Sequence, residues 1–215
     1  MAKAIWVTNM GRLIRERQPS NCSARSVICI RTEGKNTEPI YFAELLKEKH
    51  ISRSRVNCKA SKGSSPVSVV NDLVKAKERN ACEVKKGKAK IDEYWAVFFD
   101  TEGGRPGLEE AIRLAKKHDI HCVISAPSFE YWILLHYEKT SRAFVRCDEI
   151  ENILTRLVPG GYSKSGYNAK DVLSRLPEAK RNIDSIRREL GERSMTELPN
   201  TNVDDLIASI EGDPR

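Results

Sequence analysis

The sequence predicts an α/β protein in which a parallel sheet is covered by helices. Strand-like and helix-like segments alternate four times between residues 26 and 137. The strand-like segments are nearly continuous apolar runs, as expected for parallel strands buried on both faces. A chain of 215 residues, 40% hydrophobic and 31% charged, has the length and composition for one ordinary core with an appendage, or for two small domains.

The first two strands are each followed by a predicted helix. Residues 26–31 (SVICIR) form a β-branched apolar run, which indicates a buried strand. Pro39 suits the first turn of a helix that reaches about residue 49. Residues 55–59 (RVNCK) alternate like a more exposed strand, and Pro66 opens a second helix. The apolar residues that recur at helical spacing in this second helix are Val67, Val70, Leu73 and Val74.

The strongest strand signal lies in the middle of the chain. Residues 94–100 (YWAVFFD) are apolar throughout and end abruptly on an acid. A helix over residues 108–118, a fourth strand over residues 121–125 (HCVIS) and a short aromatic helix over residues 129–137 follow. These elements complete the alternation that predicts the parallel sheet.

After about residue 139 the strand signals stop. Residues 150–157, 169–190 (interrupted at Pro177) and 203–210 have helical patterns. We expect three parts in the chain: a basic N-terminal arm (1–23), an α/β domain (24–138) and a helical C-terminal extension (139–215).

The composition indicates where the protein is found and what kind of partner it binds. No run approaches the roughly 18 apolar residues that span a bilayer, so we expect no association with a membrane. Residues 1–20 lack the apolar core of a signal peptide, so we expect a cytoplasmic protein. The six scattered cysteines contain no C-x-x-C pair and indicate neither a zinc site nor a disulfide framework. The net charge of +7 favours polyanionic partners such as nucleic acid, although solvated helix faces explain much of it.

Acidic residues follow two of the predicted strands. Glu33 comes just after the first strand, and Asp100 with Glu102 closes the third. Ligands of open parallel sheets bind outside the carboxyl ends of the strands, so the three carboxylates converge if these strands are neighbours. Carboxylate oxygens suit Mg²⁺ or Mn²⁺, and an adjacent glycine, Gly34, permits close approach of a phosphate. The alternative is that each acid is an ordinary solvated turn residue.

Four segments resemble the RloB-like family, in the family's order. Residues 31–42 (RTEGKNTEPIYF) resemble its EG-x-x-TE-x-x-YF opening, and residues 98–102 (FFDTE) resemble its strand-end D-x-D. Residues 125–136 (SAPSFEYWILLH) are similar to its SNP-x-FE-x-W-x-LLH segment, and residues 162–164 (YSK) to a later Y-x-K.

The resemblance implies a TOPRIM-like fold, related to the nuclease domains of OLD-type proteins, and a role in bacterial defence against phage. It implies Glu33 as an acid that handles protons or a second metal ion, and Asp100 with Glu102 as the metal pair. Glu130 becomes a further acid of the site, and Lys164 a cation that faces the phosphate. The resemblance also implies a partner ATPase of the ABC or AAA kind.

Two residues depart from the family pattern. Glu102 replaces an aspartate and is one methylene longer, which can shift the metal, and Ala126 replaces an asparagine near Glu130. Neither change removes a carboxylate. The aromatic residues that begin the helix at residue 129 are expected to pack in the core rather than stack on bases. His136 is expected to be structural, with general-base catalysis as the alternative.

The leading hypothesis is therefore a metal-dependent nuclease. A non-catalytic subunit that binds nucleic acid or an ATPase and retains a TOPRIM-like shell is the alternative. The sequence is also compatible with a homo-oligomer, and it leaves open whether the substrate is DNA or RNA.

Overall fold

The computed structural model describes residues 28–87, 90–99, 106–144, 146–191 and 199–212. Five strands form one sheet in the order β2-β1-β3-β4-β7, and a separate hairpin consists of β5 and β6. The first four strands are parallel, and β7 pairs antiparallel with β4. The strands are β1 (Ile28–Thr32), β2 (Val56–Ala60), β3 (Glu93–Phe99), β4 (His121–Ala126), β5 (Tyr162–Ser163), β6 (Gly166–Tyr167) and β7 (Asn200–Thr201).

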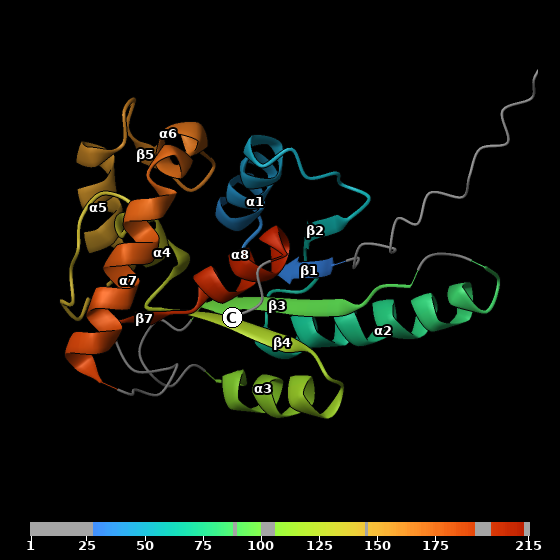
Figure 1. The fold of residues 1–215 in the computed structure, drawn as a ribbon. Helices are drawn as coiled ribbons and strands as arrows, with labels where there is room; N and C mark the ends of the chain where they lie inside the picture. The colour runs from blue at the N-terminus through green and yellow to red at the C-terminus, as the bar shows by residue number, and fades with distance from the viewer. Residues whose placement is uncertain (1–27, 88–89, 100–105, 145, 192–198, 213–215) are drawn as a thin grey trace, which may run out of the picture.

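Helices cover both faces of the sheet (Figure 1). On one face lie α2 (Pro66–Val84) and α3 (Leu108–Lys117). The other face carries α1 (Thr37–Glu48), α4 (Phe129–Leu134), α5 (Cys147–Leu157), α6 (Ala169–Ser174), α7 (Leu176–Leu190) and α8 (Val203–Glu211). The predicted α/β class with a mostly parallel sheet and C-terminal helices is confirmed, and the arrangement is consistent with a TOPRIM-like fold.

The apolar strands divide their side chains between two cores. In β3, Trp95 and Val97 pack beneath the C-terminal helices, whereas Ala96 and Phe98 pack against α2 and α3. Successive residues of a strand point to opposite faces. The predicted third strand is therefore apolar at every position because each of its faces is covered.

Local signals account for the start of α2. Ser65 and Ser68 form a reciprocal capping box, in which each hydroxyl accepts a hydrogen bond from the other residue's backbone N–H. Pro66 occupies the first turn, where its missing N–H leaves no bond unmade. The helix therefore begins where its sequence predicts.

The C-terminal segment joins the same sheet. Strand β7 pairs with β4 through Ser125 and Thr201, whose hydroxyl oxygens lie 2.7 Å apart. Arg187 on α7 holds the buried carboxylate of Asp204 on α8 with two hydrogen bonds of 2.7 and 2.8 Å. Strand β7 and the β5–β6 hairpin were not predicted, because two-residue strands are too short to show a sequence period.

Candidate active site

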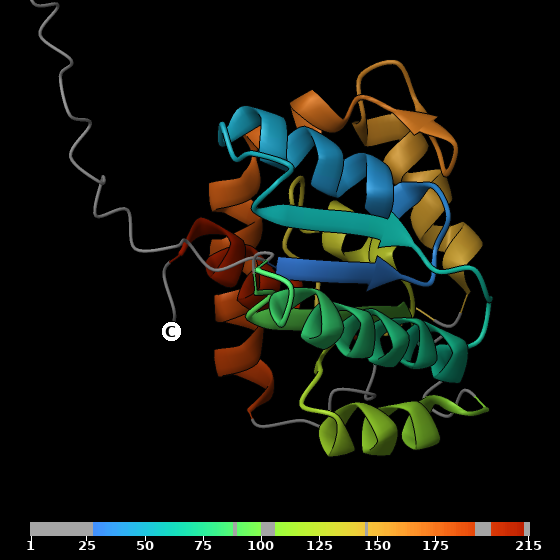
Figure 2. The ribbon, with the colours of Figure 1, turned by 90° about the vertical axis from the view of Figure 1, so that its right-hand side faces the viewer.

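The site lies at the carboxyl ends of the parallel strands, which share one edge of the sheet (Figure 2). Strands β1 and β3 are neighbours, as the convergence of their acids requires. Glu33 follows β1 directly, is 5% exposed, and donates its backbone N–H to the Val97 carbonyl of β3 at 3.0 Å. Asp100 and Glu102 come next along the chain after β3 ends at Phe99, but they lie outside the described residues. The predicted cluster of three acids therefore stays a prediction.

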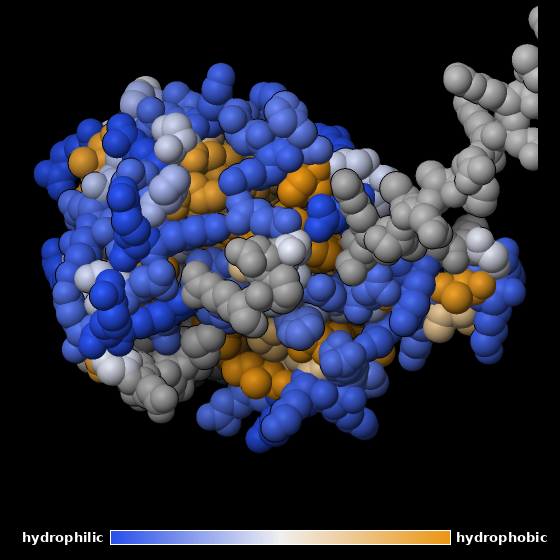
Figure 3. All heavy atoms as spheres, viewed as in Figure 1, coloured by the Kyte–Doolittle hydropathy of each residue, from blue (hydrophilic) through white to orange (hydrophobic). Residues whose placement is uncertain are grey.

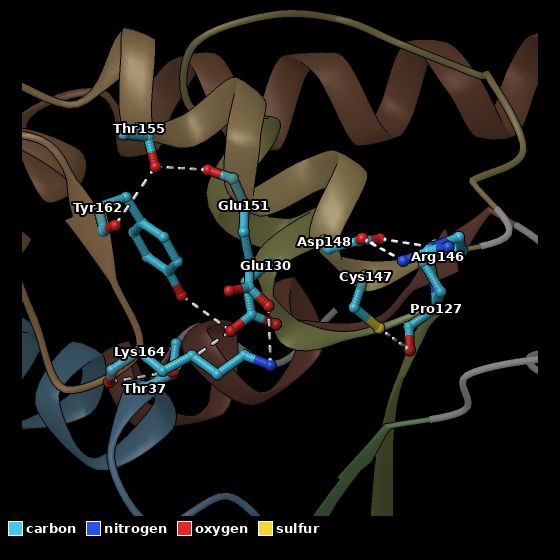
Figure 4. A network of polar contacts seen from close by, with 10 residues as sticks. All are labelled: Thr37, Pro127, Glu130, Arg146, Cys147, Asp148, Glu151, Thr155, Tyr162 and Lys164. Carbon is cyan, nitrogen blue, oxygen red and sulfur yellow. Dashed lines mark hydrogen bonds and ion pairs between the residues drawn. The ribbon is translucent and has the colours of Figure 1, made fainter.

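Glu130 lies in the first turn of α4, the helix that follows β4 at this edge. The chain turns from β4 into α4 through the cis peptide bond of Ala126 and Pro127. Glu130 is 4% exposed, and the Tyr162 phenol donates a hydrogen bond to its Oε1 at 2.8 Å. The Thr37 hydroxyl lies 3.3 Å from the same oxygen (Figure 4). These contacts fix one oxygen of the Glu130 carboxylate.

Glu38, which the sequence analysis did not single out, is a third buried acid here. It is 3% exposed, and its carboxylate lies so close over Gly34 that a Cβ at Gly34 would come within 1.9 Å of Oε2. Burial, together with smaller contributions from the Glu130 and Glu33 carboxylates, raises the pKa of Glu38 to about 7, against hydrogen bonds from the backbone of Glu38 and Gly34. The three acids therefore interact electrostatically.

The β5–β6 hairpin carries Lys164 to this edge. Its Nζ forms an ion pair with Glu151 Oε1 at 2.9 Å. Partial burial opposes the charge, but the Glu151 hydrogen bond and the fields of Glu130 and Glu151 raise the pKa of Lys164 above its ordinary value. Lys164 therefore stays protonated across the neutral range.

Thr37 and Tyr167 tie this hairpin to α1. The Tyr167 phenol donates to the Thr37 carbonyl at 3.0 Å, and the Thr37 hydroxyl lies 3.4 Å from the Lys164 carbonyl. That hydroxyl has one hydrogen and two acceptors in reach, the Lys164 carbonyl and Glu130. The hairpin therefore docks on the same residues that hold the buried acids.

A pocket of about 260 Å³ opens among these elements. Its walls come from the β1–α1 turn, the start of α4, the start of α5 and the hairpin. The lining residues are Gly34, Lys35, Asn36, Thr37, Glu38, Ser128, Phe129, Glu130, Cys147 and Lys164. Burial raises the pKa of the Cys147 thiol, and its contact with the Ser128 hydroxyl lowers it in part. The structure thus brings Glu130 and Lys164 to one pocket, together with Glu38.

His136 and the aromatic residues around it belong to the core. His136 is 1% exposed, and its Nε2 lies 3.0 Å from the Tyr41 hydroxyl. Its Nδ1 donates to the Trp132 carbonyl at 2.9 Å, so Nε2 accepts from Tyr41. Burial lowers the pKa of His136 to about 4, which keeps the ring neutral. The expectation of a structural histidine packed among aromatic side chains agrees with this geometry.

Two of the predicted metal ligands, Asp100 and Glu102, lie outside the described residues. Within the described ranges, no group of three or more His, Cys, Asp or Glu side chains is arranged to hold a metal ion. Carboxylate oxygens are the ligands that a hard cation prefers, and positive charge would relieve the repulsion between Glu38 and the Glu33 and Glu130 carboxylates.

The sequence was also compared with known proteins. A sequence model of the family described as RloB-like protein matches residues 28–210. No curated protein and no solved structure matches the chain. No helix among the described residues is both long and apolar enough to cross a bilayer.

Proposed function

The chain belongs to the RloB-like family, and we propose that it cleaves phosphodiester bonds of nucleic acid in a reaction that depends on Mg²⁺ or Mn²⁺. One observation carries this proposal: Glu33, Glu38 and Glu130 are buried at the carboxyl edge of a parallel sheet. Asp100 and Glu102 follow the strand that ends at this edge. Buried acids in this number are unfavourable unless a cation or protons neutralise them.

The proposed metal ligands are Glu33, Asp100 and Glu102. When bound, the ion would polarise a phosphoryl oxygen and lower the pKa of a water molecule. Glu33 suits this task because its backbone is fixed to β3 by the hydrogen bond to Val97. The carboxylates themselves supply oxygen ligands of the type that Mg²⁺ and Mn²⁺ prefer.

The other residues of the pocket divide the remaining tasks. Lys164 supplies a compact positive charge for a phosphate, and Glu151 holds its ammonium group in place. Glu130 is held as an acceptor by Tyr162. Glu38, with a pKa of about 7, can bind or release a proton near neutral pH. The site therefore combines oxygen ligands, a cation and a proton-exchanging group.

The wider setting of the proposal is bacterial defence against phage, with a partner ATPase of the ABC or AAA kind. The surface offers a hollow of about 680 Å³ between α1 and the start of α6, a region where Figure 3 shows apolar side chains. Its lining combines apolar residues with Lys47, Arg53 and Lys170. This surface also supports the alternative, a non-catalytic subunit that binds a partner protein or nucleic acid.

The test is cleavage by the purified full chain. The protein is incubated with DNA and with total RNA, in EDTA, Mg²⁺ or Mn²⁺, with and without the ATPase. Metal-dependent cleavage of either nucleic acid supports the proposal. If no cleavage occurs in any combination, and Mn²⁺ titration followed by electron paramagnetic resonance shows no bound ion, the non-catalytic alternative replaces it.

A further inference from the structure

Ser128 has a buried hydroxyl group in the wall of the site pocket. The residue is 4% exposed and lies between β4 and α4. It occupies the N-cap position of α4, where a serine hydroxyl usually accepts a hydrogen bond from a backbone N–H of the helix. Here the hydroxyl makes no such bond.

Apart from the Cys147 sulfur, Ser128 Oγ has no hydrogen-bond partner in the described part of the chain. The Cys147 sulfur lies beside it, but a thiol sulfur is a weak acceptor, and the thiol itself points its hydrogen toward the Pro127 carbonyl at 3.9 Å. A buried hydroxyl with no stronger partner than a thiol is unfavourable and rare in folded proteins. Its position in a pocket wall indicates that a ligand supplies the missing partner.

The other groups of the pocket determine what that ligand is. The two buried carboxylates of the pocket already receive hydrogen bonds: Glu130 from Tyr162, and Glu38 from its own backbone N–H and that of Gly34. Donors with hydrogens to spare include Ser128 and the ammonium of Lys164, which has three hydrogens and an ion pair with Glu151, and Lys35 and Asn36 also line the pocket. Hydroxyl and ammonium donors together select an anionic oxygen group.

We propose that Ser128 and Lys164 form a subsite for one phosphate of a nucleic-acid strand. Ser128 donates its hydroxyl hydrogen to a phosphate oxygen, and Lys164 supplies positive charge on the same group. A pocket of about 260 Å³ is smaller than the roughly 300–1,000 Å³ of pockets that enclose drug-sized ligands, so it has room for one phosphate and part of its nucleotide but not for a base pair. The identity of the strand as the source of the phosphate rests on the proposed function.

The test measures binding without cleavage. Inorganic phosphate and a nucleoside 5′-monophosphate contain no phosphodiester bond, so their binding can be measured calorimetrically with Mg²⁺ present. A short single-stranded oligonucleotide is measured in EDTA. The variants are Ser128→Ala and, as the matched control, Ser165→Ala, which removes an exposed hydroxyl next to Lys164 outside the pocket lining.

We expect Ser128→Ala to weaken oligonucleotide binding about tenfold or more, as for loss of a hydrogen bond to a charged group, and Ser165→Ala to leave it unchanged. The melting temperature of Ser128→Ala should equal or exceed that of the parent, because the substitution removes an unsatisfied buried group. Parental affinity in Ser128→Ala overturns the subsite. A lowered melting temperature overturns it too, because the hydroxyl would then have a structural partner.

The probes distinguish a nucleic-acid strand from free phosphate as the ligand, and they test the phosphate subsite separately from the proposed nuclease activity. Ser128-dependent binding of phosphate or mononucleotide without binding of the oligonucleotide would overturn the strand as the source. A parent chain that cleaves nucleic acid while Ser128→Ala binds like the parent refutes the subsite alone. A chain that binds the oligonucleotide through Ser128 but never cleaves it refutes the nuclease and supports the subsite.

Discussion

The phenol of Tyr162 donates a hydrogen bond of 2.8 Å to the buried carboxylate of Glu130. This bond joins the β5–β6 hairpin to α4 across 32 residues of sequence and holds the pocket wall that carries Lys164. Burial raises the pKa of Tyr162, and the Glu130 carboxylate raises it further, so the phenol remains a donor. A hydroxyl and a carboxylate from distant segments thus fix the geometry of the site.

Removal of this phenol should destabilise the protein. We expect Tyr162→Phe to lower the free energy of unfolding by about 1.5–3 kcal/mol, the range for a hydrogen bond to a charged group, when measured by urea titration. Tyr131→Phe is the matched control, because Tyr131 donates to the neutral backbone carbonyl of Thr140, and its loss should be about 0.5–1.5 kcal/mol. Equal losses in the two variants would contradict a charged acceptor at Glu130.

Glu38 should make stability depend on pH. Its folded-state pKa of about 7 lies above the ordinary value of 4.5, so the folded protein binds more protons than the unfolded chain between these values. Stability should therefore fall as the pH rises from 4.5 to 7, by about 3 kcal/mol for this group, and then level off. Urea unfolding in EDTA at a series of pH values measures this slope.

Glu38→Gln should flatten that slope, because its side chain does not ionise. Glu48→Gln, which changes an exposed acid at the end of the same helix, should retain it. A slope that is identical in Glu38→Gln and the parent would show that another group is responsible.

Asp100→Asn tests the proposed metal ligand. The change removes one charge and keeps the size of the side chain, so we expect a parental melting temperature, weakened Mn²⁺ binding and no detectable cleavage. Asp119→Asn is the control, because Asp119 is an exposed acid that precedes β4 at the opposite edge of the sheet. Full activity in well-folded Asp100→Asn would exclude Asp100 as a ligand of a catalytic metal.

Lys164→Ala separates a catalytic lysine from a surface lysine. If its charge stabilises the transition state, the cleavage rate falls roughly a hundredfold or more while Mn²⁺ affinity changes little. Lys117→Ala is the control, because Lys117 is an exposed lysine at the end of α3, just before β4 begins at the opposite edge of the sheet; this variant should leave the rate unchanged. If Lys164→Ala cleaves at the parental rate at low salt, the catalytic site consists of the acids alone. Lys164 is then a surface lysine, whose loss weakens only salt-sensitive binding.

The sequence predicts the framework of this site better than its contents. The apolar run of residues 94–100 predicts β3, because both faces of that strand are buried. Strand β7 could not be predicted, because its two residues, Asn200 and Thr201, are too few to show an alternating pattern. The sequence does not mark Glu38 as a site residue, because an acid in the first turn of a helix is ordinarily explained by its favourable interaction with the helix dipole. Its burial over Gly34 depends on contacts that only the folded chain reveals.

The side chains that surround Lys164 show the same limit. Its partner Glu151 lies 13 residues earlier on a different element, and nothing in either local sequence marks the pair. The roles of Asp100 and Glu102 remain predictions, since both lie outside the described residues.

The short pairing of β4 with β7 has a consequence for folding during synthesis. Ser125 and Thr201 are 76 residues apart, and the Tyr167–Thr37 bond spans 130 residues. Because a ribosome releases the chain from its N-terminus, all four parallel strands emerge before the hairpin that walls the pocket. A growing polypeptide therefore carries Glu33, Glu38 and Glu130 without Lys164. Any cleaving activity that needs Lys164 would arise only after the β5–β6 hairpin has emerged.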